Sequence, residues 1–528
     1  MQQFTLTLPS PIVCSPYQNS MSLLTSLSWL SFPSILLLLP LMFLTTLIIF
    51  KKSRSSLNLP PGPPPLPIIG NMHQLGVVSH NSLLSLFKTY GPLLHLQLGS
   101  VPTLVVSSAE LAKEVMKYQD LNFCSRPPFM SQKRLSYNFQ DIAFVPYGEY
   151  WREMRKISIV ELFSTKRIQS FGFIREEEVS QMIALISDSC SSSKPINLSD
   201  LLLTLTSNII CRAAFGKCYI GGAEKSDFHR ISLETQALFV AFFVGDFIPW
   251  LGWIDTLTGQ RARLEKNFFE LDAFYDQVID EHMDPERPKS EHEDFVDVMI
   301  KVQKDLNLTR DHIKGVLMNI LVAGTDTGSA TVVWAMTELI RNPRVMKKAQ
   351  DEVRSVVGSK NKVEESDLSQ LHYLKLVVKE TFRLHCPAPL LVPRETIRHC
   401  TINGYDILPK TLVFVNAMAI GRDPEYWKDP DEFVPERFID SEVDYRGTHF
   451  QLIPFGAGRR ICPGMSFGTM TVELTMANLV YHFNWEFPSG VNKENIDMSE
   501  APGITVHKKS DLLLVATKTS SSDVQRQE

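Results

Sequence analysis

Cys462 lies in a run of residues whose types and spacing suit the binding of a haem iron through sulfur. The run is Pro454–Gly464, with the sequence PFGAGRRICPG. A cysteine thiolate as axial ligand pushes electron density onto the iron and favours O–O cleavage. Gly458 and Gly464 would let the backbone approach a flat porphyrin and turn tightly around the sulfur, and Arg460 offers a fork of donors for a propionate. The alternative, a buried free thiol, is the commoner fate of a lone cysteine, but this spacing disfavours it.

The run also carries a family resemblance. It matches Phe-x-x-Gly-x-Arg-x-Cys-x-Gly at Phe455, Gly458, Arg460, Cys462 and Gly464. This pattern resembles the haem-binding signature of the cytochrome P450 superfamily, and the likeness extends from the prolines near residue 60 to about residue 518. The chain is most similar to the plant microsomal, or A-type, enzymes of specialised metabolism. The resemblance implies haem b, iron protoporphyrin IX, with the Cys462 thiolate as the metal ligand.

A second motif lies in the longest amphipathic segment, which runs from about Thr309 to Asn342 and stops before Pro343. As a helix it would be roughly 50 Å long. Within its apolar middle stands Ala323–Thr327, with the sequence AGTDT. Buried acid and hydroxyl groups cost free energy unless they have partners. The alternative to a functional role is hydroxyl bonding to the preceding helical turn.

The resemblance assigns this motif to an oxygen-binding groove. It implies that Gly324 leaves space for dioxygen, that Thr327 holds dioxygen and a water, and that Asp326 relays protons inward. Gly328 departs from the Thr or Ser that usually follows in the family. The acid–alcohol pair itself is intact.

Trp151 and Arg155 lie one helical turn apart and could meet the same group. Taken alone they could form an ordinary helix face. Because the pair matches the family pattern Trp-x-x-x-Arg, the resemblance implies that both contact a haem propionate. Arg394, in the returning segment Val392–Arg394, is a weaker candidate for the same role.

Glu380 and Arg383 share one face of a helix that stops before Pro387. Alone they could be a surface ion pair. The resemblance implies that they interlock with Arg437, about fifty residues later, and that all three have a structural role.

The order of elements predicts a mainly α protein with a small β region. The alternating side chains of the segment 93–106 predict a hairpin whose turn is at Gly99-Ser100. Helical periodicity dominates from about residue 110. Segments with the pattern of strands return near 390–415 and 503–518. With no internal repeat in 70–515, we expect one catalytic domain over 70–528. The resemblance implies that this domain has the cytochrome P450 helical prism.

The amino-terminal part predicts a membrane anchor. Residues 29–50 carry no charge and reach the length of a bilayer-spanning helix. An uncharged leader, 1–28, precedes them, and a basic, proline-rich hinge, 51–69, follows, so the bulk of the chain is expected on the cytosolic side. With the resemblance, this implies a single-pass anchor in the endoplasmic reticulum membrane. A cleaved signal peptide is the alternative, and either Met1 or Met21 could be the working start.

Charge and cysteine content exclude other classes. A net charge of −5 over 528 residues argues against a nucleic-acid partner. The eight cysteines form no CxxC pair, which disfavours a zinc site or a disulfide framework and fits a reducing compartment. No GxGxxG opens a βαβ unit, so we expect the chain to bind neither flavin nor nicotinamide itself.

The sequence therefore predicts a haem-thiolate monooxygenase that inserts one atom of O2 into a lipophilic plant metabolite, a terpenoid, alkaloid or phenylpropanoid. Electrons from NADPH would arrive through a separate flavoprotein reductase, for which the candidate contacts are Lys156, Lys166, Arg167 and Arg459. Two alternatives remain, a same-fold isomerase or dehydratase and a haem-binding protein without catalysis. The resemblance implies that the substrate contacts side chains, mostly apolar, in Phe123–Val145, Phe239–Trp250, Leu321–Thr327, Ala388–Val392 and Gly503–Thr505.

Overall fold

The computed structural model of the chain describes residues 57–76, 78–191, 194–219, 225–288, 291–491 and 496–519. One compact unit begins at Pro60, before the expected domain start at residue 70. The expected leader, the anchor over 29–50 and the first residues of the hinge lie outside the described residues. The proline-rich stretch packs on the first strand of the unit, where the Pro61 carbonyl oxygen accepts a hydrogen bond from the His95 N–H at 2.9 Å.

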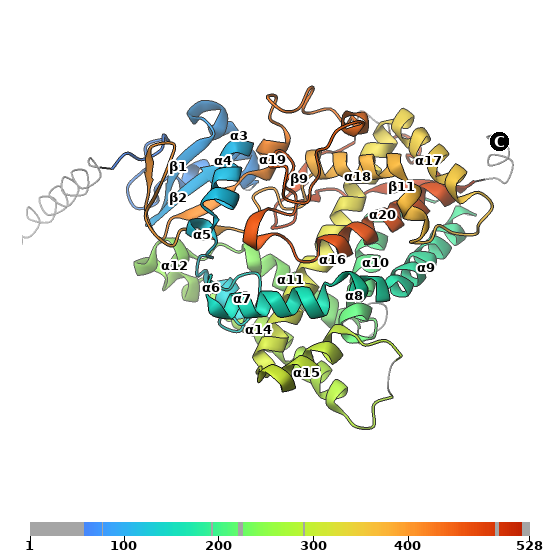
Figure 1. The fold of residues 1–528 in the computed structure, drawn as a ribbon, viewed down its shortest axis with the longest axis horizontal. Coiled ribbons are helices and arrows are strands. Elements are labelled where there is room, and N and C mark those ends of the chain that lie inside the picture. Colours follow the sequence, from blue (N-terminus) through green and yellow to red (C-terminus); the bar gives the residue numbers. More distant parts are fainter. Residues whose placement is uncertain are drawn as a thin grey trace, which may run out of the picture. The chain divides into compact units, whose positions relative to one another are not determined.

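Helices make up most of the described unit (Figure 1), as predicted. The α-helices are α3 Ser79–Tyr90, α4 Ala109–Lys113, α5 Asp120–Phe123, α6 Met130–Leu135, α7 Glu149–Ile157, α8 Thr165–Ser170, α9 Gly172–Cys190, α10 Leu198–Phe215, α11 Lys225–Val240, α12 Val244–Phe247, α13 Ile254–Leu257, α14 Gln260–Met283, α15 Phe295–Leu306, α16 Arg310–Arg341, α17 Pro343–Val357, α18 His372–Leu384, α19 Ala417–Gly421 and α20 Met465–His482.

The strands form four small sheets in the described residues, and β1 and β2 lie at one end of the unit in Figure 1. They are β1 Leu93–Leu98, β2 Val101–Val106, β3 Ile196–Asn197, β4 Arg394–Glu395, β5 Cys400–Ile402, β6 Tyr405–Ile407, β7 Leu412–Val415, β8 Phe483–Glu486, β9 Glu500–Ala501, β10 His507–Lys508 and β11 Leu513–Lys518. The largest sheet has the order β1-β2-β7-β4, in which β2 and β7 are parallel and the other pairs antiparallel. The predicted hairpin over 93–106 is confirmed, with Gly99 at φ +57° in its turn.

The helix α16 runs through the middle of the unit and packs against α10, α18 and α20. Its 32 residues give a length of about 48 Å. The helix begins after Thr309, which with His312 forms a capping box, and ends at Arg341, as predicted. Pro343 does more than stop it, because it occupies the first turn of α17, where proline needs no N–H partner.

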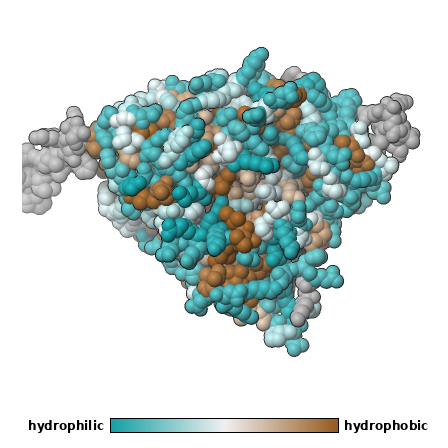
Figure 2. Space-filling model, viewed as in Figure 1, coloured by the Kyte–Doolittle hydropathy of each residue, from teal (hydrophilic) through white to brown (hydrophobic). Residues whose placement is uncertain are grey.

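Among the described residues, α10 and α16 are long and apolar enough to span a membrane. Most of each helix is buried inside the unit, where their apolar faces meet one another. Their apolar character therefore reflects a position in the protein core. The outer surface is different: the face drawn in Figure 2 is mostly hydrophilic, with a few separate hydrophobic areas.

The structure brings Glu380, Arg383 and Arg437 together. The Arg383 guanidinium donates to both Glu380 carboxylate oxygens at 2.8 Å, and Arg437 Nε donates to Glu380 Oε1 at 2.9 Å. Arg383 also donates to the carbonyl oxygens of Gly421, Pro430 and Glu432. Since Glu380 and Arg383 are fully buried, the network ties α18 to the loops that lead toward Cys462.

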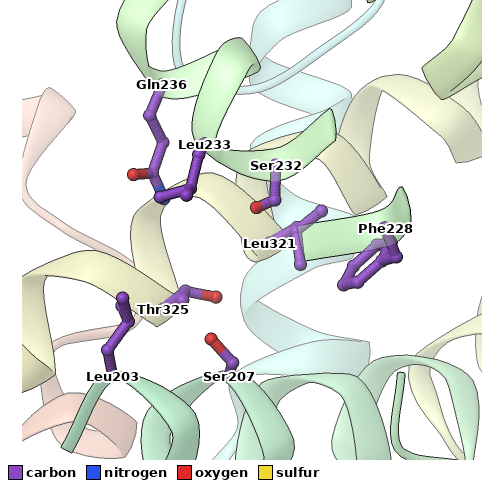
Figure 3. Close-up of a pocket in the computed structure, with 8 residues that line it drawn as sticks. All are labelled: Leu203, Ser207, Phe228, Ser232, Leu233, Gln236, Leu321 and Thr325. Atoms are coloured by element: carbon purple, nitrogen blue, oxygen red, sulfur yellow. The ribbon is translucent and has the colours of Figure 1, made fainter. Parts of the chain in front are cut away.

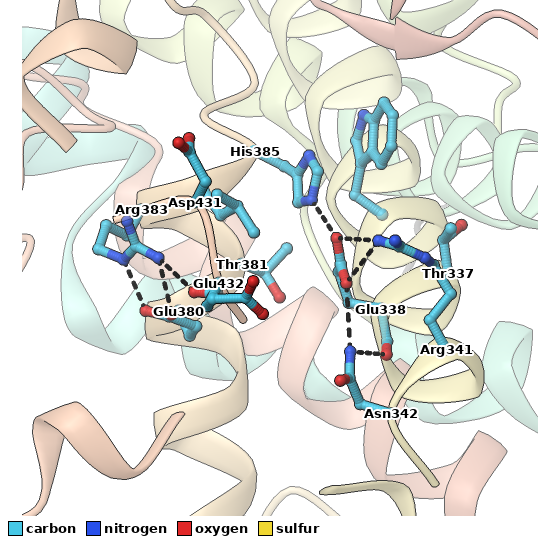
Figure 4. A network of polar contacts seen from close by, with 12 residues as sticks. Thr337, Glu338, Arg341, Asn342, Glu380, Thr381, Arg383, His385, Asp431 and Glu432 are labelled. Atoms are coloured by element: carbon cyan, nitrogen blue, oxygen red, sulfur yellow. Dashed lines mark hydrogen bonds and ion pairs between the residues drawn. The ribbon is translucent and has the colours of Figure 1, made fainter. Parts of the chain in front are cut away.

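A second buried network joins α16 to the end of α18 (Figure 4). The Glu338 carboxylate accepts from His385 Nε2 at 2.8 Å and lies 3.3 Å from the Arg341 guanidinium. The His385 ring stacks on Trp334, with 4.2 Å between ring centroids. The two networks together fix α18 against both the core helix and the later loops.

Replacing Glu380 with glutamine should destabilise the protein strongly. The amide keeps the shape of the side chain but leaves two arginines, one of them fully buried, without a negative partner. Loss of one partner of a buried ion pair costs about 3–5 kcal/mol, and urea unfolding followed by circular dichroism measures it. Lys347→Ala, which removes an exposed pair with Asp351, is the control and should cost about 0.5 kcal/mol or less. A Glu380→Gln protein as stable as this control would contradict the structural role.

Candidate active site

A cavity of about 640 Å³ lies between α10, α11, α16 and the loop that carries Cys462. Its walls are mainly apolar, and Cys462 lies at one side while Ala323, Gly324 and Thr327 of α16 lie on another. The predicted sulfur ligand and the predicted oxygen groove therefore face the same space, although the chain separates them by more than a hundred residues.

The Cys462 loop has a shape that depends on glycine. The Cys462 N–H donates to the Phe455 carbonyl oxygen at 3.0 Å, which closes the loop. Gly458 has φ +71°, and a Cβ there would lie 2.1 Å from the Met116 carbonyl oxygen. Gly464, at φ −85°, precedes α20 in a conformation open to any residue. Gly464 lines the cavity, where its missing side chain leaves room for a close approach, as expected, but its backbone makes no turn that requires glycine.

The groups around the Cys462 sulfur shift the pKa of its thiol in opposite directions. Burial raises the pKa of the thiol, whereas the backbone N–H groups of Gly464 and Met465 and the charge of Arg155 lower it. Those two amides belong to the first residues of α20 and its cap, where the helix dipole favours an anion. This donor set is suited to a thiolate that a metal ion also stabilises.

Four arginines, Arg126, Arg155, Arg394 and Arg460, line the cavity. Burial, together with the charge of neighbouring arginines, lowers the pKa of Arg460 to about 9 and the pKa of Arg126 to well below its usual range. Among the described residues, the only carboxylate paired with any of the four is Asp120, 3.4 Å from Arg394. Such a cluster of buried cations is stabilised by an added anion.

Backbone carbonyl groups hold these guanidinium groups in place. Arg460 donates to the carbonyl oxygens of Cys124, Ile142 and Val145, Arg155 to that of Ile461, and Arg394 to that of Ala457 at 3.0 Å. Arg126 donates to those of Ala143, Val392 and Pro393. Because neutral acceptors leave their charge uncompensated, the cluster fits the two carboxylates of a haem.

Arg126 was not among the residues singled out from the sequence. Its side chain is 5% exposed. It lines the cavity together with the three arginines that the sequence did predict as ligands of the cofactor. It stands between Ser125 and Pro127, within the segment Phe123–Val145 that was expected to contact the substrate but outside the motifs considered for cofactor binding. Only the fold shows that it is close to Arg394 and Arg460.

Trp151 lies one layer behind the cavity wall. Its indole N–H donates to the Ile142 carbonyl oxygen at 3.2 Å, and the Arg460 guanidinium lies 4.3 Å from its ring centroid. Trp151 is not among the lining residues, whereas Arg155 is. In this arrangement Trp151 supports Arg460 by a cation–π contact, and its expected contact with a propionate stays a prediction.

Phe455 lines the cavity beside Cys462. Its ring packs against Phe382, with centroids 5.1 Å apart, and Tyr445, at 5.6 Å. Phe382 belongs to α18. The helix that carries Glu380 and Arg383 is therefore also in contact with the Cys462 loop.

On α16, the Thr327 hydroxyl lies on the cavity wall and donates to the Ala323 carbonyl oxygen at 2.8 Å. A Cβ at Gly324 would lie 2.4 Å from Ile210 Cδ1. Gly324 thus lets α10 approach closely, a role the sequence alone did not indicate. A Cβ at Gly328 would meet Thr206 Cγ2 at 3.3 Å, so that glycine also faces α10.

Asp326 has a partner that sequence reasoning missed. Its Oδ1 lies 2.8 Å from Nε2 of His507, on β10, and both residues line the cavity. The side chain of His507 is 36% exposed and that of Asp326 only 12%. The pair therefore connects the buried carboxylate with the protein surface.

Each of the predicted substrate segments contributes residues to the cavity wall, but some apolar residues of the same segments do not reach it. Cavity-lining members include Phe144, Phe239, Leu391 and Ile504. Phe242 is instead 52% exposed.

Comparisons with known proteins agree with this site. A family model described as cytochrome P450 matches residues 60–515. Cytochrome P450 71A9 of Glycine max is 54% identical over 469 residues, covering 87% of this chain and 93% of that protein. Strychnine-11-hydroxylase of Strychnos nux-vomica is 51% identical over 498 residues, covering 92% and 97%, and cytochrome P450 71A1 of Persea americana is 54% identical over 458 residues, covering 85% and 91%.

Replacing Arg126 with glutamine should weaken haem binding. A charge-assisted hydrogen bond contributes about 1.5–3 kcal/mol, so we expect the haem dissociation constant to rise roughly 10- to 100-fold, measured by haem transfer to an excess of a haem-free acceptor protein. Arg459→Gln is the matched control, because Arg459 is half-exposed, pairs with Asp120 at 3.1 Å and does not line the cavity. Equal haem loss from both variants would contradict a role for Arg126 in binding.

Proposed function

Because the chain belongs to the cytochrome P450 family, we propose that it is a microsomal monooxygenase that hydroxylates a lipophilic plant specialised metabolite. Monooxygenase activity and a haem with a cysteine thiolate ligand follow from the family. The substrate class, the redox partner and the membrane location are the parts we propose. When bound, the haem supplies the oxidising chemistry that inserts one oxygen atom from O2.

The single observation that carries the proposal is the arrangement of the large cavity. Cys462 lies on one wall, the acid–alcohol pair Asp326 and Thr327 on another, and apolar side chains fill most of the remainder. An apolar chamber with a few polar groups suits a lipophilic small molecule. An acid and an alcohol beside the same chamber suit proton delivery.

We assign the following roles to the residues at the site. Cys462 binds the iron, and Arg126, Arg155, Arg394 and Arg460 bind the propionates. His507 takes a proton from solvent and passes it to the Asp326 carboxylate, 2.8 Å away. Thr327 then positions the delivered proton at the cavity wall. Its hydroxyl is held there by the hydrogen bond that it donates to the Ala323 carbonyl oxygen.

The substrate is proposed to be a terpenoid, alkaloid or phenylpropanoid. The name of one relative, strychnine-11-hydroxylase, describes hydroxylation of an alkaloid. The cavity of about 640 Å³ would hold the cofactor as well as the substrate, and its mainly apolar lining suits a lipophilic molecule of any of these classes.

We propose that an NADPH-dependent flavoprotein reductase docks on the Cys462 side. Of the four basic residues considered, Lys156 and Lys166 are exposed. Arg459 pairs with Asp120 at 3.1 Å and Arg167 lies 3.6 Å from Glu293. Lys156 and Lys166 are therefore the better candidates for steering an acidic partner.

We also propose a single-pass anchor over 29–50 in the endoplasmic reticulum membrane, with the catalytic domain in the cytosol. Its support is the uncharged apolar segment followed by Lys51, Lys52 and Arg54. The similarity to plant cytochromes P450 over most of the chain is consistent with it.

Microsomes that contain the chain and a plant reductase test the proposal. A panel of terpenoids, alkaloids and phenylpropanoids is screened for spectral shifts, NADPH consumption and hydroxylated product. At least one class should give product that depends on NADPH, O2 and reductase together. Conversion of a peroxide without reductase would favour the isomerase alternative, and haem binding without turnover on any panel member would favour the non-catalytic one.

Replacing Asp326 with asparagine should lower turnover about 100-fold or more, because an amide of the same shape cannot accept and release the proton. Haem content should stay unchanged, and turnover should become more sensitive to D2O. Asp311→Asn, in the first turn of the same helix, is the control and should retain full turnover. An active Asp326→Asn enzyme with an unchanged solvent isotope effect would remove Asp326 from the proton path.

A further inference from the structure

A second, much smaller pocket of about 10 Å³ lies beside the large cavity, between α10, α11 and α16. Leu203, Leu233 and Gln236 line both spaces, so the small pocket adjoins the cavity proposed for the substrate. Its polar lining comes from Ser207 and Thr325 in addition to Ser232 and Gln236 (Figure 3).

Thr325 differs from the other threonines of α16. The hydroxyls of Thr327, Thr331 and Thr337 each donate to the carbonyl oxygen four residues earlier, at 2.7–2.8 Å. This bond is the usual way for a helix to satisfy a threonine. Thr325 is 4% exposed, and its buried hydroxyl has no hydrogen-bond partner within the described part of the chain.

Two serine hydroxyls point into the same space. Ser207 of α10 is 3% exposed and Ser232 of α11 is 6% exposed. In Figure 3 the oxygen atoms of Thr325, Ser207 and Ser232 are directed toward the space between the three helices, with the Gln236 amide at its edge. Three hydroxyls from three helices thus converge next to an apolar cavity.

The size and polarity of the pocket match a single oxygen atom. A space of about 10–15 Å³ on this scale is what one water needs, together with two to four polar partners. A buried hydroxyl left without any partner is destabilising. A water or an alcohol oxygen, which both donates and accepts, would give the Thr325 hydroxyl the partner that it lacks and would lie beside both serine hydroxyls.

We propose that Thr325, Ser207 and Ser232 form a binding site for one hydroxyl oxygen, supplied either by a fixed water or by a hydroxyl group of the ligand in the large cavity. The ligand part rests on the proposed function, whereas the oxygen site does not. In a mainly apolar cavity, one fixed polar contact orients the ligand and so selects which carbon faces Cys462.

The test is a crystal structure of the haem-loaded, full-length protein in detergent at about 2 Å or better, without ligand and with menthol or p-menthane, a matched alcohol and hydrocarbon. We expect density for one oxygen within hydrogen-bond distance of Thr325 Oγ1 in the ligand-free protein. Its persistence with both ligands identifies a fixed water, and its replacement by the menthol hydroxyl identifies a ligand subsite. An empty pocket, or a Thr325 hydroxyl bonded to the Leu321 carbonyl oxygen, overturns the proposal.

Thermal unfolding of Thr325→Val gives an independent solution test. Valine keeps the shape but removes the hydroxyl, so the midpoint should fall by about 1 °C or more if that hydroxyl holds an oxygen. The control, Thr337→Val, removes a hydroxyl bonded within its own helix and should change the midpoint less. A midpoint that rises in Thr325→Val, as removal of an unsatisfied hydroxyl would cause, overturns the proposal. Neither readout depends on catalysis, so a failure of the proposed function would leave both results interpretable.

Discussion

The structure depends on the presentation of one sulfur atom, Cys462, to a cavity that α16 also lines. The backbone bond from Cys462 to Phe455 closes the loop, and the close approach of Gly458 to Met116 allows no side chain there. The first residues of α20 follow directly, and α20 packs along α16. A shift of either helix would therefore change the distance between the sulfur and the Asp326–Thr327 pair.

The charge around this cavity fits an anionic occupant such as the haem that the family binds. Arg126, Arg394 and Arg460 are buried and Arg155 is half-buried. Carbonyl groups hold all four, and Asp120 is the one carboxylate that forms an ion pair with any of them among the described residues. Their mutual repulsion favours two added carboxylates, and the amides near Cys462 favour a thiolate. Asp326, the acid proposed for proton transfer, belongs to α16 and contacts the partly exposed His507.

The sequence predicted the parts of the site that are local in the chain. The Cys462 run, the long helix ending before Pro343 and the hairpin around Gly99 each depend on residues close in sequence, and the structure has each element where it was expected. Contacts between distant segments were not predictable in the same way. Arg126 and His507 reach the site only through the tertiary fold. Trp151 lies against Arg460, which is distant in sequence. The pocket that the unpaired Thr325 hydroxyl lines forms only where three helices meet.

The most direct test of the account is the carbon monoxide difference spectrum of the reduced protein, compared between the wild type and Cys462→Ser. The wild type should give the absorption band of thiolate-ligated haem, and the variant should lose this band together with monooxygenase turnover. Cys400→Ser, which changes a partly buried cysteine in β5, should keep both. A Cys462→Ser protein that retained the thiolate band would contradict the assignment of the iron ligand and the mechanism built on it.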